Sequence, residues 1–229
     1  MASSLEISAA GDSAIVIEWG EPGVDAQANV RAVAVAARIR RLAVDGVLDV
    51  VPTLRTVGVH FDPLRITRER LAAVLQSVHL DDGVDDSAQA GKLHQIPVCY
   101  GGAFGPDLAD VAAITGLSEE AVVSEHTAPV YRVLMLGFMP GFAYMGPVAS
   151  AIKVSRRTTP RVSIPAGSVA IAGHQTGIYP SESPGGWQII GRTPVRPFDL
   201  DRIPPFLFAP GDRVQFQSVS AALFEQDAR

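Results

Sequence analysis

The 229-residue sequence has little cysteine, little charge and no long uninterrupted run of apolar residues. Because Cys99 is its one cysteine, no internal disulfide can form, which favours a reducing compartment, and we expect a cytoplasmic protein. The first residues lack a basic segment followed by a long apolar one, so no secretory signal is expected. No stretch predicts a membrane-spanning helix, and the net charge of −5 gives no support to nucleic-acid binding.

Standard catalytic motifs are absent as well. The sequence contains no G-x-x-x-x-G-K-[ST] phosphate loop, no G-x-G-x-x-G after an expected strand and no G-x-S-x-G nucleophile turn. It has no H-E-x-x-H or C-x-x-C pair, and its five histidines are scattered, so no metal site is expected. Any nucleotide site in this chain must therefore be unconventional.

The sequence does contain enough apolar material for a folded core, since 47% of its residues are hydrophobic and 19% are charged. Residues 1–91 carry the whole net charge of −5, whereas residues 92–229 are neutral. The change falls in the acidic, glycine-containing segment 81–91. We interpret this segment as a linker between two domains, 1–91 and 92–229, with a solvated loop inside one domain as the alternative.

Residues 1–91 show the pattern of a small α+β domain. The expected strands are 4–10, 13–19, 47–52 and 55–61, and the expected helices are 24–44 and 68–78. Gly11-Asp12 marks a hairpin between the first two strands, and Thr67 can cap the second helix. The order ββαββα predicts helices on one face of an antiparallel sheet.

Residues 92–229 show a different pattern. After a strand at 92–100, a short helix at 108–115 ends at Gly116, and a second helix begins after Ser118 and runs to about His126. Short apolar runs follow at 132–136, 163–165, 168–171, 187–191 and 213–218, separated by glycine and proline. This pattern predicts a β-barrel or rolled sheet with functional loops.

Three segments of the second half are candidates for chemistry. Segment 136–146 has three glycines, one proline and three aromatic residues, which suit neither a regular helix nor a central strand. It forms either a buried aromatic loop or a backbone that approaches a ligand between aromatic walls. Segment 159–180 carries hydrogen-bonding side chains near its turns, and the basic cluster of residues 153–157 with Arg161 is either a solvated face or an anion site.

The third segment, residues 181–194, combines an anion nest with an unneutralised arginine. Gly185-Gly186 can present successive backbone N–H groups to an anion. Trp187 either packs in the core or stacks on a ligand ring. Arg192 has no acidic neighbour in the sequence, so it either pairs across the fold or binds an anion.

These segments resemble the family of the 5-oxoprolinase B subunit, also named allophanate hydrolase subunit 1 or Kip-type kinase inhibitor. The matching motifs are Gly137–Tyr144 (GFMPGFAY), residues 165–173 (PAGSVAIAG), 175–180 (QTGIYP), 183–187 (SPGGW) and 190–194 (IGRTP). Residues 100–102 and 104–108, with His126 and Tyr131, fit the family's middle region. Ala103 departs from the family pattern, which has an acidic residue after the two glycines.

The resemblance implies a small α+β N-terminal domain followed by a cyclophilin-like β-barrel domain. It implies a subunit of a hydrolase complex that uses ATP, with Mg²⁺, to open 5-oxoproline to L-glutamate. The partners it implies are a homologous second subunit of the 5-oxoprolinase C type (allophanate hydrolase subunit 2) and the lactam-utilisation protein that forms the A component. A chain of this kind is expected to be inactive alone, so the heteromeric complex is the hydrolase.

From these motifs we hypothesise a composite site at the subunit interface. Its catalytic groups are Arg192 and Arg161, which would hold a carboxylate or phosphate, and His126, which either transfers protons or is a structural histidine at a helix end. The substrate-binding residues are Phe138, Gly141, Phe142, Tyr144, Gly167, Ser168, Gln175, Thr176, Tyr179, Gly185, Gly186 and Trp187. Two alternatives stay open: an inhibitor of a sensor histidine kinase, and the carboxyltransferase-type module of a urea-degrading enzyme.

Overall fold

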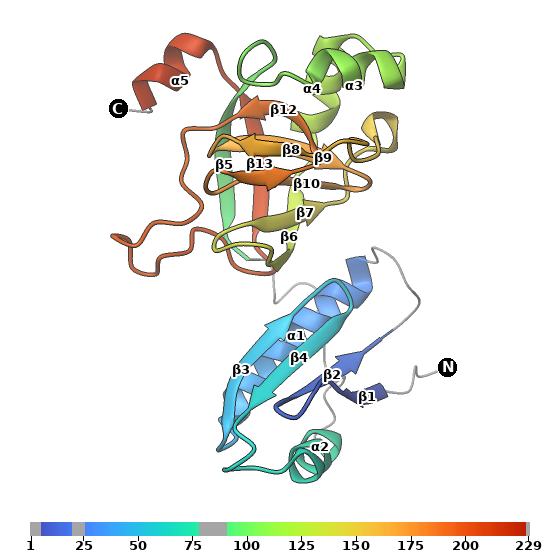
Figure 1. The fold of residues 1–229 in the computed structure, drawn as a ribbon, viewed down its shortest axis with the longest axis vertical. Coiled ribbons are helices and arrows are strands. Elements are labelled where there is room, and N and C mark those ends of the chain that lie inside the picture. The colour runs from blue at the N-terminus through green and yellow to red at the C-terminus, as the bar shows by residue number, and fades with distance from the viewer. Residues whose placement is uncertain (1–5, 20–25, 78–90, 228–229) are drawn as a thin grey trace. The chain divides into compact units, whose positions relative to one another are not determined.

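The computed structural model describes residues 6–19, 26–77 and 91–227, and the chain divides into two compact units, residues 1–90 and 91–229 (Figure 1). Each unit has its own hydrophobic core. Of the proposed linker, residues 81–90 lie outside the described residues. No helix in the described ranges is long and apolar enough to cross a membrane.

The first unit is an antiparallel sheet with two helices. In chain order its elements are β1 (Glu6–Ala9), β2 (Ala14–Glu18), α1 (Ala26–Leu42), β3 (Val47–Pro52), β4 (Thr56–Phe61) and α2 (Arg68–Ser77). The strands lie in the order β1-β2-β4-β3. Ile17 of β2 and Val59 of β4 are buried in one cluster with Ile39 of α1 and Leu71 of α2. Both helices therefore cover the same face of the sheet.

The second unit is built around a closed β-barrel with the strand order β10-β7-β6-β13-β5-β12-β9. Its strands are β5 (Leu93–Tyr100), β6 (Tyr131–Leu136), β7 (Ala143–Gly146), β9 (Ser168–Ala172), β10 (Gln175–Ile178), β12 (Gln188–Arg192) and β13 (Arg213–Ser218). Neighbouring strands are antiparallel except β5 and β13, which are parallel. The expectation of a β-barrel in this half of the chain is confirmed.

Apolar side chains fill the barrel interior and continue beneath two helices, α3 (Leu108–Thr115) and α4 (Glu119–Thr127). Val133 of β6 and Phe216 of β13 belong to the same buried cluster as Val111 of α3. Figure 1 shows α3 and α4 together at one end of the barrel. The two helices therefore extend the core rather than stand apart from it.

The boundary between α3 and α4 follows local rules that the sequence predicts. Gly116 ends α3 in the left-handed conformation, with a φ of 71°. The Ser118 hydroxyl then accepts a hydrogen bond of 3.1 Å from the Ala121 N–H and caps α4. Three further elements complete the unit: a 3₁₀ turn at Ser150–Ile152, the ribbon described next, and α5 (Ala221–Asp227), which is not among the helices expected from the sequence.

A two-stranded ribbon covers part of the outer face of the barrel. It pairs β8 (Arg161–Ile164) with β11 (Ser183–Gly185). Ile164 of the ribbon is buried in one cluster with Ala170 of β9, whereas the neighbouring Ile171 belongs to the interior cluster. Because successive strand residues point to opposite faces, Ala170 faces outward and the ribbon covers it.

The expectation that segment 136–146 does not suit a central strand is wrong for its last four residues. Residues 143–146 form β7, which pairs with β6 and β10 inside the barrel sheet. A Cβ on Gly146 would lie 2.7 Å from the carbonyl oxygen of His174. The glycine is therefore needed for close approach between β7 and the backbone of the turn that joins β9 to β10, although glycine in a sequence normally indicates a turn.

Candidate functional site

Five aromatic rings assigned to a ligand site by the sequence lie together on the outer face of the barrel. They belong to Phe138, Phe142, Tyr144, Tyr179 and Trp187. Phe142 lies at the centre, with ring centroids 4.9 Å from Tyr144, 5.3 Å from Tyr179 and 5.6 Å from Trp187. All three contacts are edge-to-face, the arrangement that aromatic quadrupoles favour. We call these five residues the aromatic wall.

Phe138 forms the open edge of the aromatic wall. Its side chain is 61% exposed, while its ring still contacts Phe142 at a centroid distance of 5.5 Å. Its φ is 69°, a left-handed conformation that costs a non-glycine residue about 1–2 kcal/mol. Strained backbone of this kind gathers at binding and catalytic sites, so a strained turn that presents an exposed aromatic ring favours a ligand site.

The two tyrosines of the wall carry neutral hydroxyl groups. Burial raises the pKa of Tyr144 and Tyr179 above the ordinary value, although the positive charge of nearby Arg156 acts in the opposite direction on both. Their hydroxyls can therefore both donate and accept hydrogen bonds near neutral pH. A Cβ on Gly185 would come within 2.5 Å of the Tyr179 hydroxyl, so this glycine makes room for the phenol.

Arg161 is partly exposed and pairs with a buried carboxylate. Asp107, just before α3, is 1% exposed and accepts hydrogen bonds from Arg161 Nη1 at 2.7 Å and Nη2 at 2.6 Å. It also accepts from Arg157 Nη1 and from the Ile189 N–H, each at 2.7 Å. The hydrogen bonds that Arg161 donates to Asp107 raise the pKa of Arg161. In the described structure Arg161 therefore already binds an anion, the Asp107 carboxylate, in the bidentate geometry typical of arginine and carboxylate.

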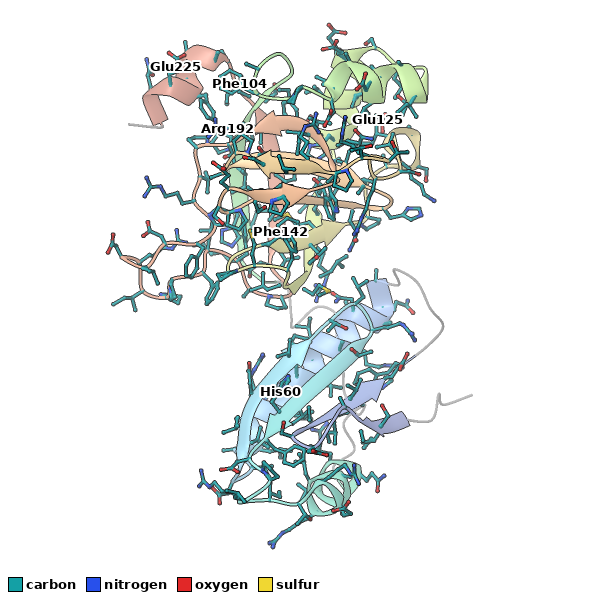
Figure 2. All side chains as sticks on the ribbon, viewed as in Figure 1. His60, Phe104, Glu125, Phe142, Arg192 and Glu225 are labelled. Atoms are coloured by element: carbon teal, nitrogen blue, oxygen red, sulfur yellow. The ribbon has the colours of Figure 1, made fainter. Side chains whose placement is uncertain are left out.

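Arg192 lies in a different environment. It lines a cavity of 390 Å³ together with Gly167, Thr193 and Arg196. Its Nε donates a hydrogen bond of 2.8 Å to the Ala166 carbonyl, which fixes the guanidinium at the cavity. Figure 2 labels Arg192 on the barrel unit. Among the described residues, no acidic side chain is paired with Arg192, so its Nη groups remain available to an anion.

His126 lies in the barrel interior rather than on the aromatic wall. Thr176 Oγ1 donates to the Ala170 carbonyl at 3.0 Å, so it accepts from His126 Nε2 at 2.8 Å, and Nδ1 then accepts from the Tyr100 hydroxyl at 2.7 Å. The imidazole also stacks on Phe216 with a centroid distance of 4.6 Å. Burial lowers the pKa of His126 to about 3, so the ring is neutral near pH 7. His126 and Thr176 thus satisfy each other inside the core.

The remaining residues assigned by the sequence shape the backbone around the site. They are Gly141, Gly167, Ser168, Gln175 and Gly186. Gly141 and Gly167 have φ values of 83° and 81°, which glycine tolerates best. The buried Ser168 hydroxyl donates to the Pro165 carbonyl at 2.7 Å, and the Gly186 carbonyl accepts an N–H from the 155–159 loop at 2.7 Å. Gln175 is half-buried at the start of β10.

Comparison with known proteins defines the class. A family model described as carboxyltransferase domain, subdomain C and D, matches residues 5–208, and the chain belongs to this family. Within it, the chain is 40% identical to the 5-oxoprolinase B subunit of Bacillus subtilis (strain 168) over 229 residues. That similarity covers 96% of this chain and 95% of the Bacillus protein.

Two solved structures show the same fold. The crystal structure of TTHA0988 superposes with a TM-score of 0.80 at 40% identity, covering 91% of this chain, and this chain spans 40% of that one. The urea amidolyase of K. lactis superposes with a TM-score of 0.77 at 20% identity, covering 98% of this chain and 15% of that enzyme. The second likeness supports the fold alone.

Proposed function

We propose that this chain is a subunit of an ATP-dependent 5-oxoprolinase, which opens the ring of 5-oxoproline to give L-glutamate. The observation that carries the proposal is the 40% identity to a 5-oxoprolinase B subunit along almost the whole length of both chains. The geometry supports it, because the exposed ring of Phe138 at the edge of the aromatic wall offers an apolar contact to a small ring, and Arg192 lines a cavity where its guanidinium can meet an anion.

The reaction needs ATP because a lactam is a resonance-stabilised amide that water attacks slowly. In the proposed sequence the lactam oxygen attacks the γ-phosphorus of ATP, and ADP leaves. Water then adds to the activated carbon, and the ring C–N bond breaks as its nitrogen takes up a proton, which leaves an acyl phosphate. A second water hydrolyses the acyl phosphate to the carboxylate of glutamate and free phosphate. Such steps depend on cations and N–H donors around the developing charge, which is the role we propose for Arg192.

The site is proposed to be composite. The groups that this chain exposes around the aromatic wall and Arg192 can bind and orient a substrate, while the imidazole of His126 is enclosed in the core. We assign water activation and proton transfer to the two partners, a homologous subunit of the C type and a lactam-utilisation protein of the A type. The chain would then be inactive alone, and Mg²⁺ would enter with the phosphates of ATP.

Reconstitution tests this proposal. ADP and glutamate release are measured for the three subunits with 5-oxoproline, omitting each subunit in turn. We expect glutamate only when this chain is present. Arg192→Ala should lower kcat/KM at least tenfold, about 1.4 kcal/mol, and Arg192→Lys should restore part of the loss. Arg213→Ala, at an exposed position on β13, is the matched control. Glutamate formation without this chain, or an assembled complex that leaves 5-oxoproline untouched, would contradict the proposal.

A second candidate function is carboxyl transfer in a biotin-dependent enzyme. It is favoured by the description of the family model, a carboxyltransferase domain. The two candidates differ in their products. Transfer of a carboxyl group from carboxybiotin to a urea-type amide, by a complex that contains this chain and releases no glutamate, would favour the second over the first.

A further inference from the structure

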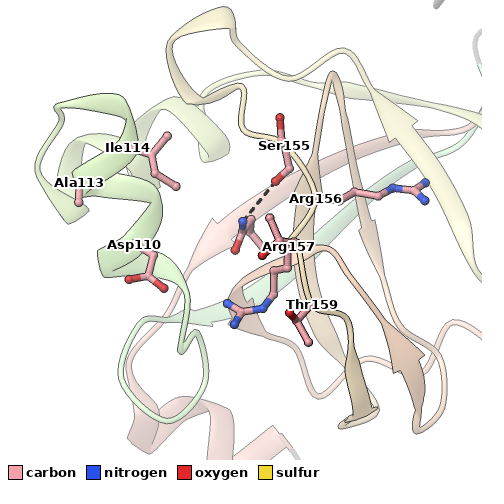
Figure 3. A pocket seen from close by; sticks show the side chains of 9 residues that line it. Asp110, Ala113, Ile114, Ser155, Arg156, Arg157 and Thr159 are labelled. Carbon is pink, nitrogen blue, oxygen red and sulfur yellow. Dashed lines mark hydrogen bonds between the residues drawn. The ribbon is translucent and has the colours of Figure 1, made fainter.

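A second cavity of the barrel unit lies between α3 and the loop Ser155–Thr159. Its volume is 530 Å³, within the range of small-molecule sites. Figure 3 shows Asp110, Ala113 and Ile114 of α3 on one side and the loop on the other. Gln188 of β12 completes the lining. None of these residues belongs to the aromatic wall or to the Arg192 cavity.

Hydrogen bonds within the protein hold the Ser155–Thr159 loop in place. Its Arg157 donates through Nη1 to the buried Asp107 at 2.7 Å, and the Arg157 N–H donates to the Gly186 carbonyl at 2.7 Å. The Gln188 Nε2 donates to the Ser155 carbonyl at 3.2 Å (Figure 3). Three contacts from separate parts of the fold therefore hold five consecutive residues, which reduces the entropy lost on binding.

Two side chains that line the cavity carry buried polar atoms that the described protein leaves without a partner. Gln188 Oε1 and Arg157 Nε are both buried without a hydrogen-bond partner among the described residues. An unpaired buried acceptor or donor costs about 1–3 kcal/mol, so each favours a ligand or water that pairs with it. Arg156 is exposed and makes no ion pair within the described ranges. Its charge also reaches Tyr144 and Tyr179 of the aromatic wall.

The balance of charge and polarity in this cavity fits an anionic ligand with an apolar part. Around the cavity, the 155–161 region has three arginines, and the only aspartates counted with them are Asp107 and Asp110. The net charge of these five side chains is therefore positive. Ser155, Thr158 and Thr159 add hydroxyl donors beside the guanidinium groups, a combination that suits phosphate oxygens. On the opposite wall, Ala113 and Ile114 are apolar beside Asp110, and Ile114 is 65% exposed.

We propose that this cavity binds a purine nucleoside polyphosphate. The phosphates lie against the Ser155–Thr159 loop, the base packs on Ile114, and its exocyclic amino group donates to Gln188 Oε1. Asp110 is the carboxylate of the lining, and one carboxylate with substrate phosphates is a common way to hold Mg²⁺. The choice of ATP among such nucleotides rests on the proposed function, and Arg156 lies where its charge can act on both the nucleotide and the aromatic wall.

The first experiment measures binding of Mg²⁺ with a non-hydrolysable ATP analogue to the purified full chain by titration calorimetry. Ile114→Glu places a negative charge on the exposed cavity wall and should weaken binding at least tenfold. Val130→Glu adds the same charge at another exposed apolar position of the barrel unit, before β6, and should change binding less than twofold. Ile114→Leu should bind as the original chain does.

The second experiment tests recognition of the base. Inosine triphosphate lacks the exocyclic amino group of ATP, so the original chain should bind ATP several-fold more tightly. Gln188→Met removes the acceptor oxygen with little change of size, and should bring the affinities for the two nucleotides to within twofold of each other. The result is the ratio of the affinities of one variant for the two nucleotides. A variant that binds both nucleotides more weakly by the same factor leaves this ratio unchanged.

These outcomes separate the nucleotide site from the proposed function. If the purified chain binds no nucleotide, or if Ile114→Glu and Val130→Glu behave alike, the nucleotide site is overturned even where the complex turns over 5-oxoproline. If the chain binds ATP with the expected pattern but the complex leaves 5-oxoproline untouched, the site stands and the proposed function fails.

Discussion

Arg161 and Arg192 lie on the same barrel unit and have the same side chain, yet their surroundings differ completely. Arg161 donates from both Nη groups to the buried Asp107, whereas Arg192 lines a cavity and pairs with no acidic side chain among the described residues. The same contrast separates His126, whose ring nitrogens are both satisfied in the core, from Gln188, whose Oε1 is not. Residue type alone therefore does not distinguish structural groups from binding groups. The state of their hydrogen bonds does.

The largest effect is expected when the carboxylate that pairs with Arg161 is removed. Asp107→Ala leaves Arg157 and Arg161 without their carboxylate and the Ile189 N–H without its acceptor. Breaking a buried ion pair costs about 3–5 kcal/mol, and we expect a loss of that size in the free energy of unfolding. Urea denaturation measures it.

Asp110→Ala is the control for this experiment, since Asp110 is an exposed aspartate in the first turn of α3, which Asp107 precedes. We expect a change within about 0.5 kcal/mol, as for most surface substitutions. Equal stabilities for the two variants would show that the Asp107 network contributes little, and would leave Arg161 available as a binding group.

A smaller effect should appear in the pH dependence of stability. The pKa of His126 is about 3 in the folded chain and near 6.5 when unfolded, because burial disfavours the charged ring. Between these values the unfolded chain binds more protons, so stability falls as the pH drops from 6.5 towards 3 and is unaffected above. The slope from one such group approaches about 1.4 kcal/mol per pH unit.

We call the fall of stability between pH 6.5 and pH 3 the acid limb. His126→Gln should flatten the acid limb while keeping groups that can donate and accept hydrogen bonds. His174→Gln, at an exposed histidine of the barrel unit, should leave the limb unchanged. Denaturation midpoints measured from pH 7 to pH 4 compare the two variants. An acid limb of the same steepness in His126→Gln would mean that His126 is not sealed in the core, and would return it to the list of proton-transfer candidates.

The sequence predicts most elements because their signals are local. The helix at 108–115, its end at Gly116 and the cap at Ser118 all depend on neighbours within a few residues. The five aromatic residues assigned to the site from the sequence motifs do lie together in the structure, but this proximity does not test their role in binding. The domain boundary and the roles of the site residues stay predictions.

Long-range pairing is where sequence reasoning fails. Asp107 and its two arginines are separated by 50 and 54 residues, so nothing local indicates that Arg161 already has an anion. The strand β7 is hidden for the same reason, because Gly146 is needed only by a backbone that arrives from His174. Gln188 escapes notice because its unpaired oxygen exists only in the folded chain.

The smallest expected effect concerns Phe138, where the binding surface itself carries strain. Glycine adopts the φ of 69° without penalty and alanine does not, while both substitutions remove the exposed ring. Phe138→Gly should therefore be about 1 kcal/mol more stable than Phe138→Ala in urea denaturation. In the reconstituted complex the two variants should raise the KM for 5-oxoproline by the same factor, because they lose the same ring. Equal stabilities would show that the turn is unstrained, and an unchanged KM in both would remove Phe138 from the binding surface.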